Sequence, residues 1–264
     1  MKVKTVTEIV NKIKQPHGGY IQTRWFKQYS YDDGIVLNKS ENILANIIGL
    51  CVEYLTQKFL GFETEYVFKS CLYGVNNYLI FKGETDNSYF KYILREIDKA
   101  YELTDDVIKY ALELCSYDVC YKTGDCSYFK PIPEPNVETI ENIRTMVKRG
   151  ITFFEKEGMP CECGFSVSDV TPNIVGFGDF LTDDTIIDFK TVNGGLTAKY
   201  TLQLFLYYRL GIFSNNRNLW NVSNIGIFNP RLNKYYVLNI NDIPEDVLNT
   251  LDEIFLVKNW SIKL

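Results

Sequence analysis

IVGFGDFLTDDTIIDFKTV, residues 174–192, is the stretch of sequence that decides the fold. Two apolar runs, 173–181 and 185–192, flank Asp183 and Asp184, which are residue types typical of a tight turn. The pattern therefore predicts two antiparallel strands joined as a β-hairpin.

The hairpin predicts a candidate site. Period-two alternation places Ile186, Asp188 and Lys190 on one face of the second strand. Pairing of the strands brings Asp179 beside Asp188, and two converging carboxylates favour a cation between them. A hard cation such as Mg²⁺, which prefers oxygen ligands, suits that position. Lys190 points the same way and is suited to orient a water molecule or to stabilise charge on a phosphate.

The surrounding pattern predicts an α-β-β-β-α-β-β-α order. The expected elements are a helix over 137–158, strands over 161–168, 173–181 and 185–192, a helix over 197–211, strands over 222–228 and 235–240, and a helix from about Pro244. Residues 1–136 read as helices with one or two short strands. Expected features there are a helix with Ser40 as N-cap and a helical pair over 87–115 with a cap at Thr104. Three prolines within 130–135 mark the boundary, so we predict an N-terminal helical lobe, 1–136, and a core, 137–264.

Composition restricts the function classes. The chain has 264 residues, 46% of them hydrophobic, and its 28 Lys and Arg against 33 Asp and Glu give a net charge of −5. This excludes a disordered protein and argues against a general nucleic-acid coat. Neither a signal peptide nor a membrane span is apparent, since the longest apolar-rich run without charge is 42–52. Together with an odd count of seven cysteines, this predicts a cytoplasmic, reduced protein without a membrane partner.

A polar pair lies on the helix expected over 197–211. Gln203 and Tyr207 are four residues apart and share a face, which taken alone is typical of a buried helix with one satisfied amide. Taken together, Gly-x-Gly-Asp, Ile-Asp-Phe-Lys-Thr and Gln-x3-Tyr resemble the PD-(D/E)XK nuclease superfamily. The Gln-x3-Tyr element is similar to that of its RecB-like branch, which includes phage exonucleases. The resemblance covers about 137–264.

The resemblance implies a fold and an activity. It implies an α/β (α+β) restriction-endonuclease-like core, αβββαβ, with a mixed sheet flanked by helices and an N-terminal helical lobe that covers or completes the active site. It also implies metal-dependent hydrolysis of phosphodiester bonds in nucleic acid, with DNA favoured over RNA as substrate. In the family's pattern Asp179 and Asp188 bind Mg²⁺ or Mn²⁺ and Lys190 assists the nucleophile. Gln203 and Tyr207 lie along the nucleic-acid path.

The chain departs from the family's pattern at the third metal ligand. RecB-like nucleases usually have a helical Gly-x3-His, whereas the single histidine here, His17, lies in a predicted loop. The helical counterpart is Gly49-x3-Glu53, so Glu53 is the first choice for the additional ligand, although a solvated helix residue explains it equally well. The alternatives are Glu141, Glu155 and Glu162.

The cysteine positions and the net charge also depart from the family's pattern. No cysteine follows Cys163, and the spacings lack the paired C-x2-C of a zinc or iron–sulfur site. Residues 137–264 carry a net charge of −3, and the residues available for a basic surface are Arg144, Lys148, Arg149, Lys199, Arg209, Arg231 and Lys234. These features favour a nuclease that is recruited by a protein partner, acts as a homo-oligomer or cuts short substrates. The competing interpretation is a catalytically silent protein that keeps the fold to bind nucleic acid or another protein.

Overall fold

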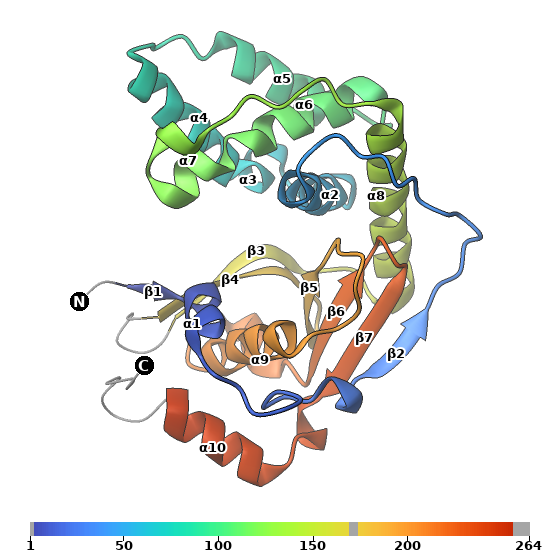
Figure 1. Cartoon of the computed structure of the whole chain (residues 1–264), viewed down its shortest axis with the longest axis vertical. Helices are drawn as coiled ribbons and strands as arrows, with labels where there is room; N and C mark the ends of the chain where they lie inside the picture. The colour runs from blue at the N-terminus through green and yellow to red at the C-terminus, as the bar shows by residue number, and fades with distance from the viewer. Residues whose placement is uncertain (1–2, 169–173, 256–264) are drawn as a thin grey trace. The chain divides into compact units, whose positions relative to one another are not determined.

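The computed structural model describes residues 3–168 and 174–255, and the chain divides into two compact units (Figure 1). The first, here called the sheet unit, comprises Met1–Tyr31, Gly158–Asn229 and Lys234–Leu264. The second, the helical unit, comprises Asp32–Glu157 and the short turn Pro230–Asn233.

The sheet unit contains a mixed β-sheet with strands in the order β1-β4-β5-β6-β7-β2, and β3 pairs with β4. Its strands are β1 (Lys4–Thr5), β2 (Lys27–Ser30), β3 (Glu162–Ser168), β4 (Ile174–Leu181), β5 (Thr185–Phe189), β6 (Asn224–Asn229) and β7 (Lys234–Asn239). The β1–β4 and β5–β6 pairs are parallel and the other pairs are antiparallel. Its α-helices are α1 (Val6–Lys12), α9 (Ala198–Gly211) and α10 (Glu245–Phe255), and they contribute to one apolar cluster with the strands (Figure 1).

The order of elements predicted after residue 136 is confirmed, as is a mixed α/β architecture with a mixed sheet flanked by helices. The strand predicted over 185–192 ends at Phe189, and Asn173, predicted to begin the preceding strand, lies outside the described residues. Thr197 caps α9, its hydroxyl accepting a hydrogen bond from the Tyr200 amide. None of the described helices has the length and apolar composition that crossing a bilayer requires.

The chain does not divide at the boundary predicted at residue 136. Residues 1–31 belong to the sheet unit, because β1 pairs with β4 and β2 pairs with β7. Helix α8 (Val137–Glu157), expected to belong to the core, is part of the helical unit. Its apolar face packs into that unit's own core through Ile143 and Met146. The helical unit is therefore an insertion between two parts of the sheet unit.

Strand β4 carries one break in its alternation. Gly178 faces the ring of Phe165, which belongs to the apolar cluster that contains α9. Leu181, three residues later on β4, belongs to the same cluster and so lies on the same face of the sheet. Strict alternation would put these two β4 residues on opposite faces. The β3–β4 register places Gly164, with a left-handed φ of 59°, opposite Asp179. The backbone thus departs from regular pleating at the residue predicted to hold the metal.

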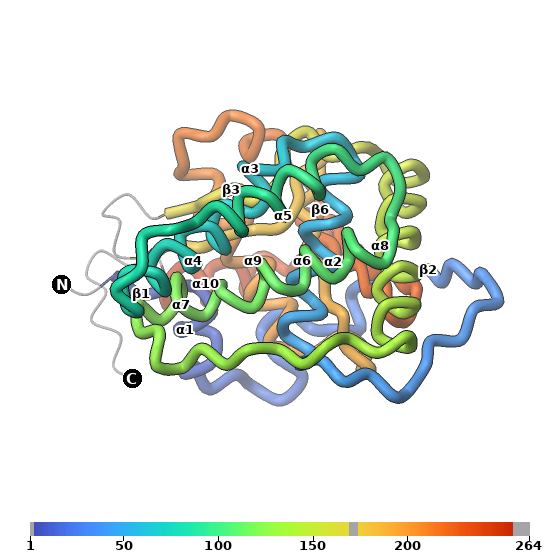
Figure 2. The backbone as a smooth tube through the Cα atoms, turned by 90° about the horizontal axis from the view of Figure 1, so that it is seen from above, coloured from blue at the N-terminus to red at the C-terminus, as the bar shows by residue number. Residues whose placement is uncertain are grey.

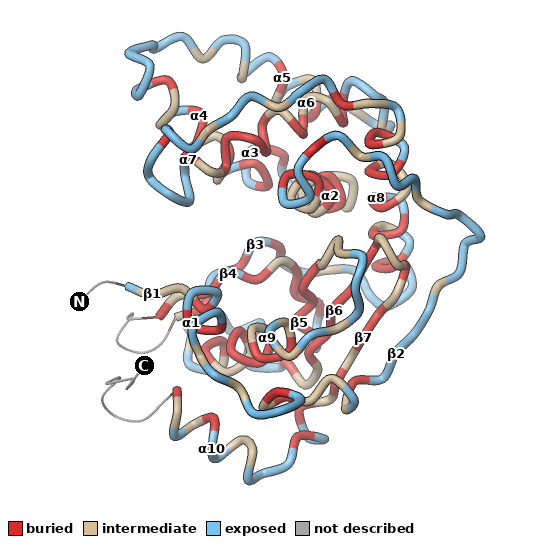
Figure 3. The backbone as a smooth tube through the Cα atoms, viewed as in Figure 1, coloured by how far each residue is buried: buried red, intermediate tan, exposed pale blue. Residues whose placement is uncertain are grey.

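The helical unit has a core of its own. Its α-helices are α2 (Ala45–Phe59), α3 (Thr64–Val67), α4 (Lys69–Lys82), α5 (Ser88–Lys99), α6 (Asp105–Ser116), α7 (Asp118–Thr123) and α8, and they can be followed from blue to yellow-green in Figure 2. Helices α2, α6 and α8 contact one another and bury Ile48, Leu112 and Ile143. Figure 3 shows buried stretches along each of these helices. The predicted cap at Thr104 is confirmed, because its hydroxyl accepts from the Val107 amide.

The buried side chain of Arg149 organises the polar part of the helical unit. Its guanidinium donates two hydrogen bonds to the Asp33 carboxylate, at 2.7 and 2.8 Å, which holds the pKa of Asp33 below its usual value. It also donates to the carbonyl oxygens of Ile35, Pro230 and Arg231, at 2.7, 3.0 and 3.1 Å. One guanidinium therefore fastens two segments that are distant in the sequence to α8.

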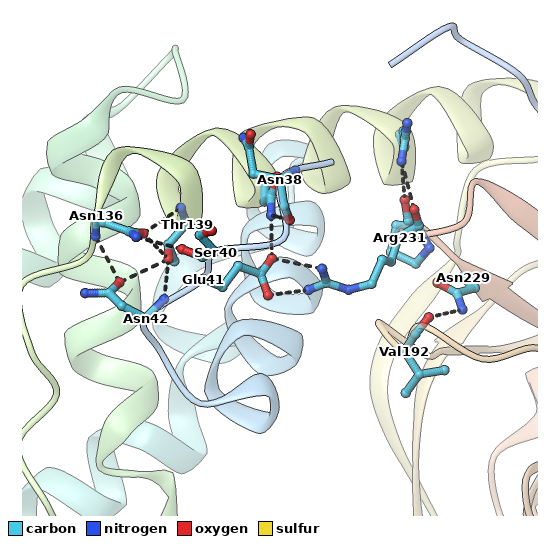
Figure 4. A network of polar contacts seen from close by, with 12 residues as sticks. Asn38, Ser40, Glu41, Asn42, Asn136, Thr139, Val192, Asn229 and Arg231 are labelled. Atoms are coloured by element: carbon cyan, nitrogen blue, oxygen red, sulfur yellow. Dashed lines mark hydrogen bonds and ion pairs between the residues drawn. The ribbon is translucent and has the colours of Figure 1, made fainter. Parts of the chain in front are cut away.

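A second polar network joins the start of the unit to α8 (Figure 4). Glu41 and Arg231 form a two-pronged ion pair at 2.9 Å, and the Ser40 carbonyl accepts from the Asn136 side chain. The prediction that Ser40 caps α2 is wrong, because that helix begins at Ala45 and Ser40 is instead held in this network.

We predict that Gly178→Ala destabilises the sheet unit. A Cβ at this position would lie 2.2 Å from the Phe165 ring, which is itself fully enclosed, so the core must shift. Overpacking of this kind costs about 1–3 kcal/mol, measured as a lower midpoint of denaturant unfolding. Gly194→Ala is the control, since a Cβ there meets nothing within 4 Å. Equal midpoints for the two variants would contradict the packing.

We also predict that Arg149→Met destabilises the helical unit by about 1–3 kcal/mol, because it leaves carboxylate and carbonyl groups without their donor. Lys148→Met, on the exposed neighbour, should have little effect. The folded state lowers the pKa of Asp33, so the ion pair's contribution is complete above the unfolded-state pKa near 3.8 and is lost as the pH falls below it. Urea unfolding at pH 7 and pH 3 tests both points, and a difference between variants that grows on acidification would contradict them.

Candidate functional site

The β4–β5 hairpin places Asp179 and Asp188 together, as the sequence predicts. Phe180 pairs with Ile187 and Leu181 with Ile186, a register that sets Asp179 opposite Asp188. The Asp179 carboxylate accepts a hydrogen bond of 2.8 Å from the backbone N–H of Phe189, the residue directly after Asp188. The first carboxylate is thus fixed by the backbone of the strand that carries the second.

Asp188 is deeply buried, with 3% of its surface exposed, and lies in a strand whose residues are all buried. Its Oδ2 lies 2.6 Å from Nζ of Lys190 in an ion pair. In the part of the chain that the structure describes, this oxygen has no partner with hydrogen-bond geometry. Lys190 also stands 5.3 Å above the ring of Tyr200 on α9. A buried carboxylate is costly to keep charged, and the Lys190 ammonium supplies the compensating positive charge at Oδ2.

Helix α9 brings Tyr207 and Gln203 to the carboxylates. The Gln203 side-chain amide donates to the Tyr207 hydroxyl at 2.7 Å, and Gly176 of β4 leaves room for the Tyr207 ring. Burial raises the pKa of Tyr207, and the negative charges of Asp188 and Asp179 raise it further. The Tyr207 hydroxyl therefore stays protonated. The structure therefore brings all five residues predicted in the sheet unit into one site.

The donor set fits a divalent metal. Asp179 and Asp188 supply carboxylate oxygens, which Mg²⁺ and Mn²⁺ prefer, and Oδ2 of Asp188 already has the Lys190 ammonium as a cationic neighbour. Among residues 3–168 and 174–255, no three His, Cys, Asp or Glu side chains gather as a metal site. Mg²⁺ is commonly held by one or two protein carboxylates, with water and substrate phosphate completing its shell, so a pair is sufficient.

The predicted third ligands are divided between the two units. Glu53, Glu141 and Glu155 belong to the helical unit, where Glu53 accepts from Gln57 at 3.1 Å and Glu141 pairs with Arg144. Their participation in the site stays a prediction. Glu162 lies on β3 in the sheet unit, but its carboxylate accepts from the side chain of Asn216 at 2.7 Å.

Sequence reasoning missed two residues of the site. Thr7 of α1 accepts a hydrogen bond from Gln203 at 3.2 Å and also contacts the Tyr207 hydroxyl. Nothing in the sequence marks Thr7, which is 196 residues away from Gln203. Tyr200, beneath the Lys190 ammonium, had a weak signal, since it precedes Gln203 by three residues and so lies close to it on the helix surface.

Most of the residues expected to form a basic surface are engaged in ion pairs with acidic side chains. Arginines 144, 149, 209 and 231 form ion pairs with Asp105, Asp33, Asp252 and Glu41, respectively. Lys199 is exposed on α9. The seven cysteines are free thiols, and six of them are buried.

Comparison of the chain with protein-family models, with curated proteins and with solved structures finds no match.

We predict that Mn²⁺ stabilises the sheet unit through Asp179 and Asp188. At a concentration about tenfold above the dissociation constant, binding to the folded state alone adds about 1.4 kcal/mol, a rise of about 3–5 °C in melting temperature. Asp188→Asn should abolish the rise, whereas Asp183→Asn, an exposed turn residue five positions earlier, should keep it. An equal rise in both variants would place the metal elsewhere.

Proposed function

We propose that the protein is a metal-dependent nuclease that hydrolyses phosphodiester bonds, with a PD-(D/E)XK-like core and DNA favoured over RNA as substrate. The observation that carries the proposal is the buried Asp188, which lies opposite Asp179 and pairs with Lys190 across 2.6 Å. A surface ion pair would be unremarkable, but here an acidic pair and a lysine converge within one buried site beside a protonated tyrosine.

Each residue has a role that its position supports. Asp179 and Asp188 would hold Mg²⁺ or Mn²⁺, and the cation would supply positive charge to stabilise the charge that develops on the phosphate. Asp179 is kept in orientation by the Phe189 N–H. The Lys190 ammonium, which lies over the Tyr200 ring, would orient the attacking water and stabilise the transition state.

Tyr207 has a donor that suits a phosphate or sugar oxygen, and Gln203 orients the hydroxyl that carries it. The Tyr207 hydroxyl keeps its proton, because burial and the two carboxylates raise its pKa, so it can donate to an anionic substrate. The Gln203 amide is held by its hydrogen bonds to Tyr207 and Thr7 and is thereby oriented before substrate arrives.

We predict that Asp188→Asn and Lys190→Ala each lower Mg²⁺-dependent cleavage at least a hundredfold, a typical loss when one stabilising charge is removed from a transition state. The assay uses the whole chain with labelled single- and double-stranded DNA and RNA, with Mg²⁺ or Mn²⁺, and with EDTA as the metal-free reference. Circular dichroism checks that the variants are folded.

Asp183→Asn and Lys27→Ala are the matched controls, since both side chains are exposed and remove the same charges away from the site. Cleavage by folded Asp188→Asn or Lys190→Ala at the unaltered rate would refute the proposed catalytic site. Binding of nucleic acid without cleavage by the unaltered protein would favour the catalytically silent alternative.

A further inference from the structure

Helices α1 and α9 lie against each other in a fixed antiparallel register. The Gln203 side chain donates to the Thr7 hydroxyl at 3.2 Å. Asn11, four residues after Thr7, accepts from the ammonium of Lys199, four residues before Gln203, at 3.3 Å. Beyond the end of α1, Gln15 donates to the carbonyl of Ala198 at 3.1 Å. A continuous polar seam therefore runs between the two helices.

The seam leads from the buried site to the surface. Tyr207, Gln203 and Lys199 follow one another at intervals of four residues, which aligns them along one face of α9. Tyr207 is buried beside the carboxylates, Gln203 is partly buried, and Lys199 is exposed. A chain bound along the seam would therefore pass from the exposed lysine toward the candidate metal site.

The outer part of this seam carries three exposed lysines, Lys12, Lys14 and Lys199. Residues 1–31 contain six Lys or Arg residues and one acidic residue, a net charge of +5. Lys12 and Lys14 are exposed at the end of α1 that carries Asn11, the partner of Lys199. The one acidic residue, Glu8, is engaged in capping, since its carboxylate accepts from the Thr5 amide at 2.8 Å. Helix α9 has no acidic residue.

The two units differ in charge accordingly. The sheet unit carries 13 Lys or Arg and 12 Asp or Glu residues, a net +1, whereas the helical unit carries 15 and 21, a net −6. The acidic balance computed over residues 137–264 thus misrepresents the unit that holds the site, because it omits the basic residues 1–31.

We infer that the α1–α9 seam binds the phosphate backbone of the nucleic-acid strand, with Lys12, Lys14 and Lys199 contacting phosphates outside the site of cleavage. The inference rests on the proposed function for its substrate class and extends it to the basic N-terminal segment. The shared ligand chemistry is the phosphodiester backbone of DNA or RNA, which lysine recognises as a point charge.

The test measures binding separately from cleavage. The whole chain carrying Asp188→Asn, without divalent metal, is titrated into fluorescent DNA and RNA oligonucleotides of one sequence at several salt concentrations. Addition of Lys12→Glu and Lys14→Glu should weaken binding at least tenfold. It should also reduce the slope of log affinity against log salt by about 1.4–1.8, corresponding to two lost phosphate contacts.

The matched control carries Lys27→Glu and Lys234→Glu, which reverse the charge of two other lysines. These lie on the paired strands β2 and β7, toward the sheet edge opposite β1. This control changes net charge equally but should leave affinity and slope close to those of the Asp188→Asn chain. Three outcomes would each overturn the inference. Both double variants could lose affinity equally, the Lys12/Lys14 variant could bind unchanged, or the Asp188→Asn chain could show no salt-dependent binding.

The outcomes also separate this inference from the proposed catalysis. Loss of binding only in the Lys12/Lys14 variant, together with no cleavage by the unaltered protein, supports the seam and refutes the nuclease. Metal-dependent cleavage by the unaltered protein, together with unchanged binding in the variant, supports the nuclease and refutes the seam. Preference between the DNA and RNA oligonucleotides identifies which backbone the seam accepts.

Discussion

The burial of one carboxylate, that of Asp188, is the constraint around which the sheet unit is arranged. A charge in that position has to be compensated, and the nearby chain supplies Lys190 for this purpose. The Lys190 ammonium lies over the Tyr200 ring of α9 in a cation–π contact. Helix α9 in turn packs against α1. Apolar residues of α1 and α9 belong to one core cluster, and both helices contact β4, the strand that carries Asp179.

The parts of the fold that follow from short-range pattern could be predicted from the sequence. The hairpin was accessible because Asp183 and Asp184 allow only a short connection, which fixes Asp179 opposite Asp188. Gln203 and Tyr207 were accessible because helical spacing alone aligns them. The Asp179–Asp188 pair and the Gln203–Tyr207 pair each lie within fewer than twelve consecutive residues. Local backbone geometry decides which side chains meet over such a short separation in sequence.

The parts that depend on distant contacts could not be predicted. Strand β1 has two residues and becomes a strand only because β4 offers an unpaired edge, so no periodicity announces it. The apolar face of α8 predicts that the helix packs on something, but its partners α2 and α6 are not specified by that face. Arg149 and Arg231 looked like surface charges, since their acidic partners lie more than a hundred residues away.

The insertion of the helical unit has a consequence for synthesis of the chain. Lys4 pairs with Ile174 and Lys27 with Val237, so β1 and β2 leave the ribosome long before the strands that they join. Residues 32–157, nearly the whole helical unit, emerge in one uninterrupted stretch before β3 exists. During that interval Arg149 already has Asp33 but still lacks the carbonyl groups of the turn at residues 230–233. Translation therefore lets nearly all of the inserted unit be made first, whereas β1 lacks its partner until β4 has been made and β2 lacks its partner until β7 has been made.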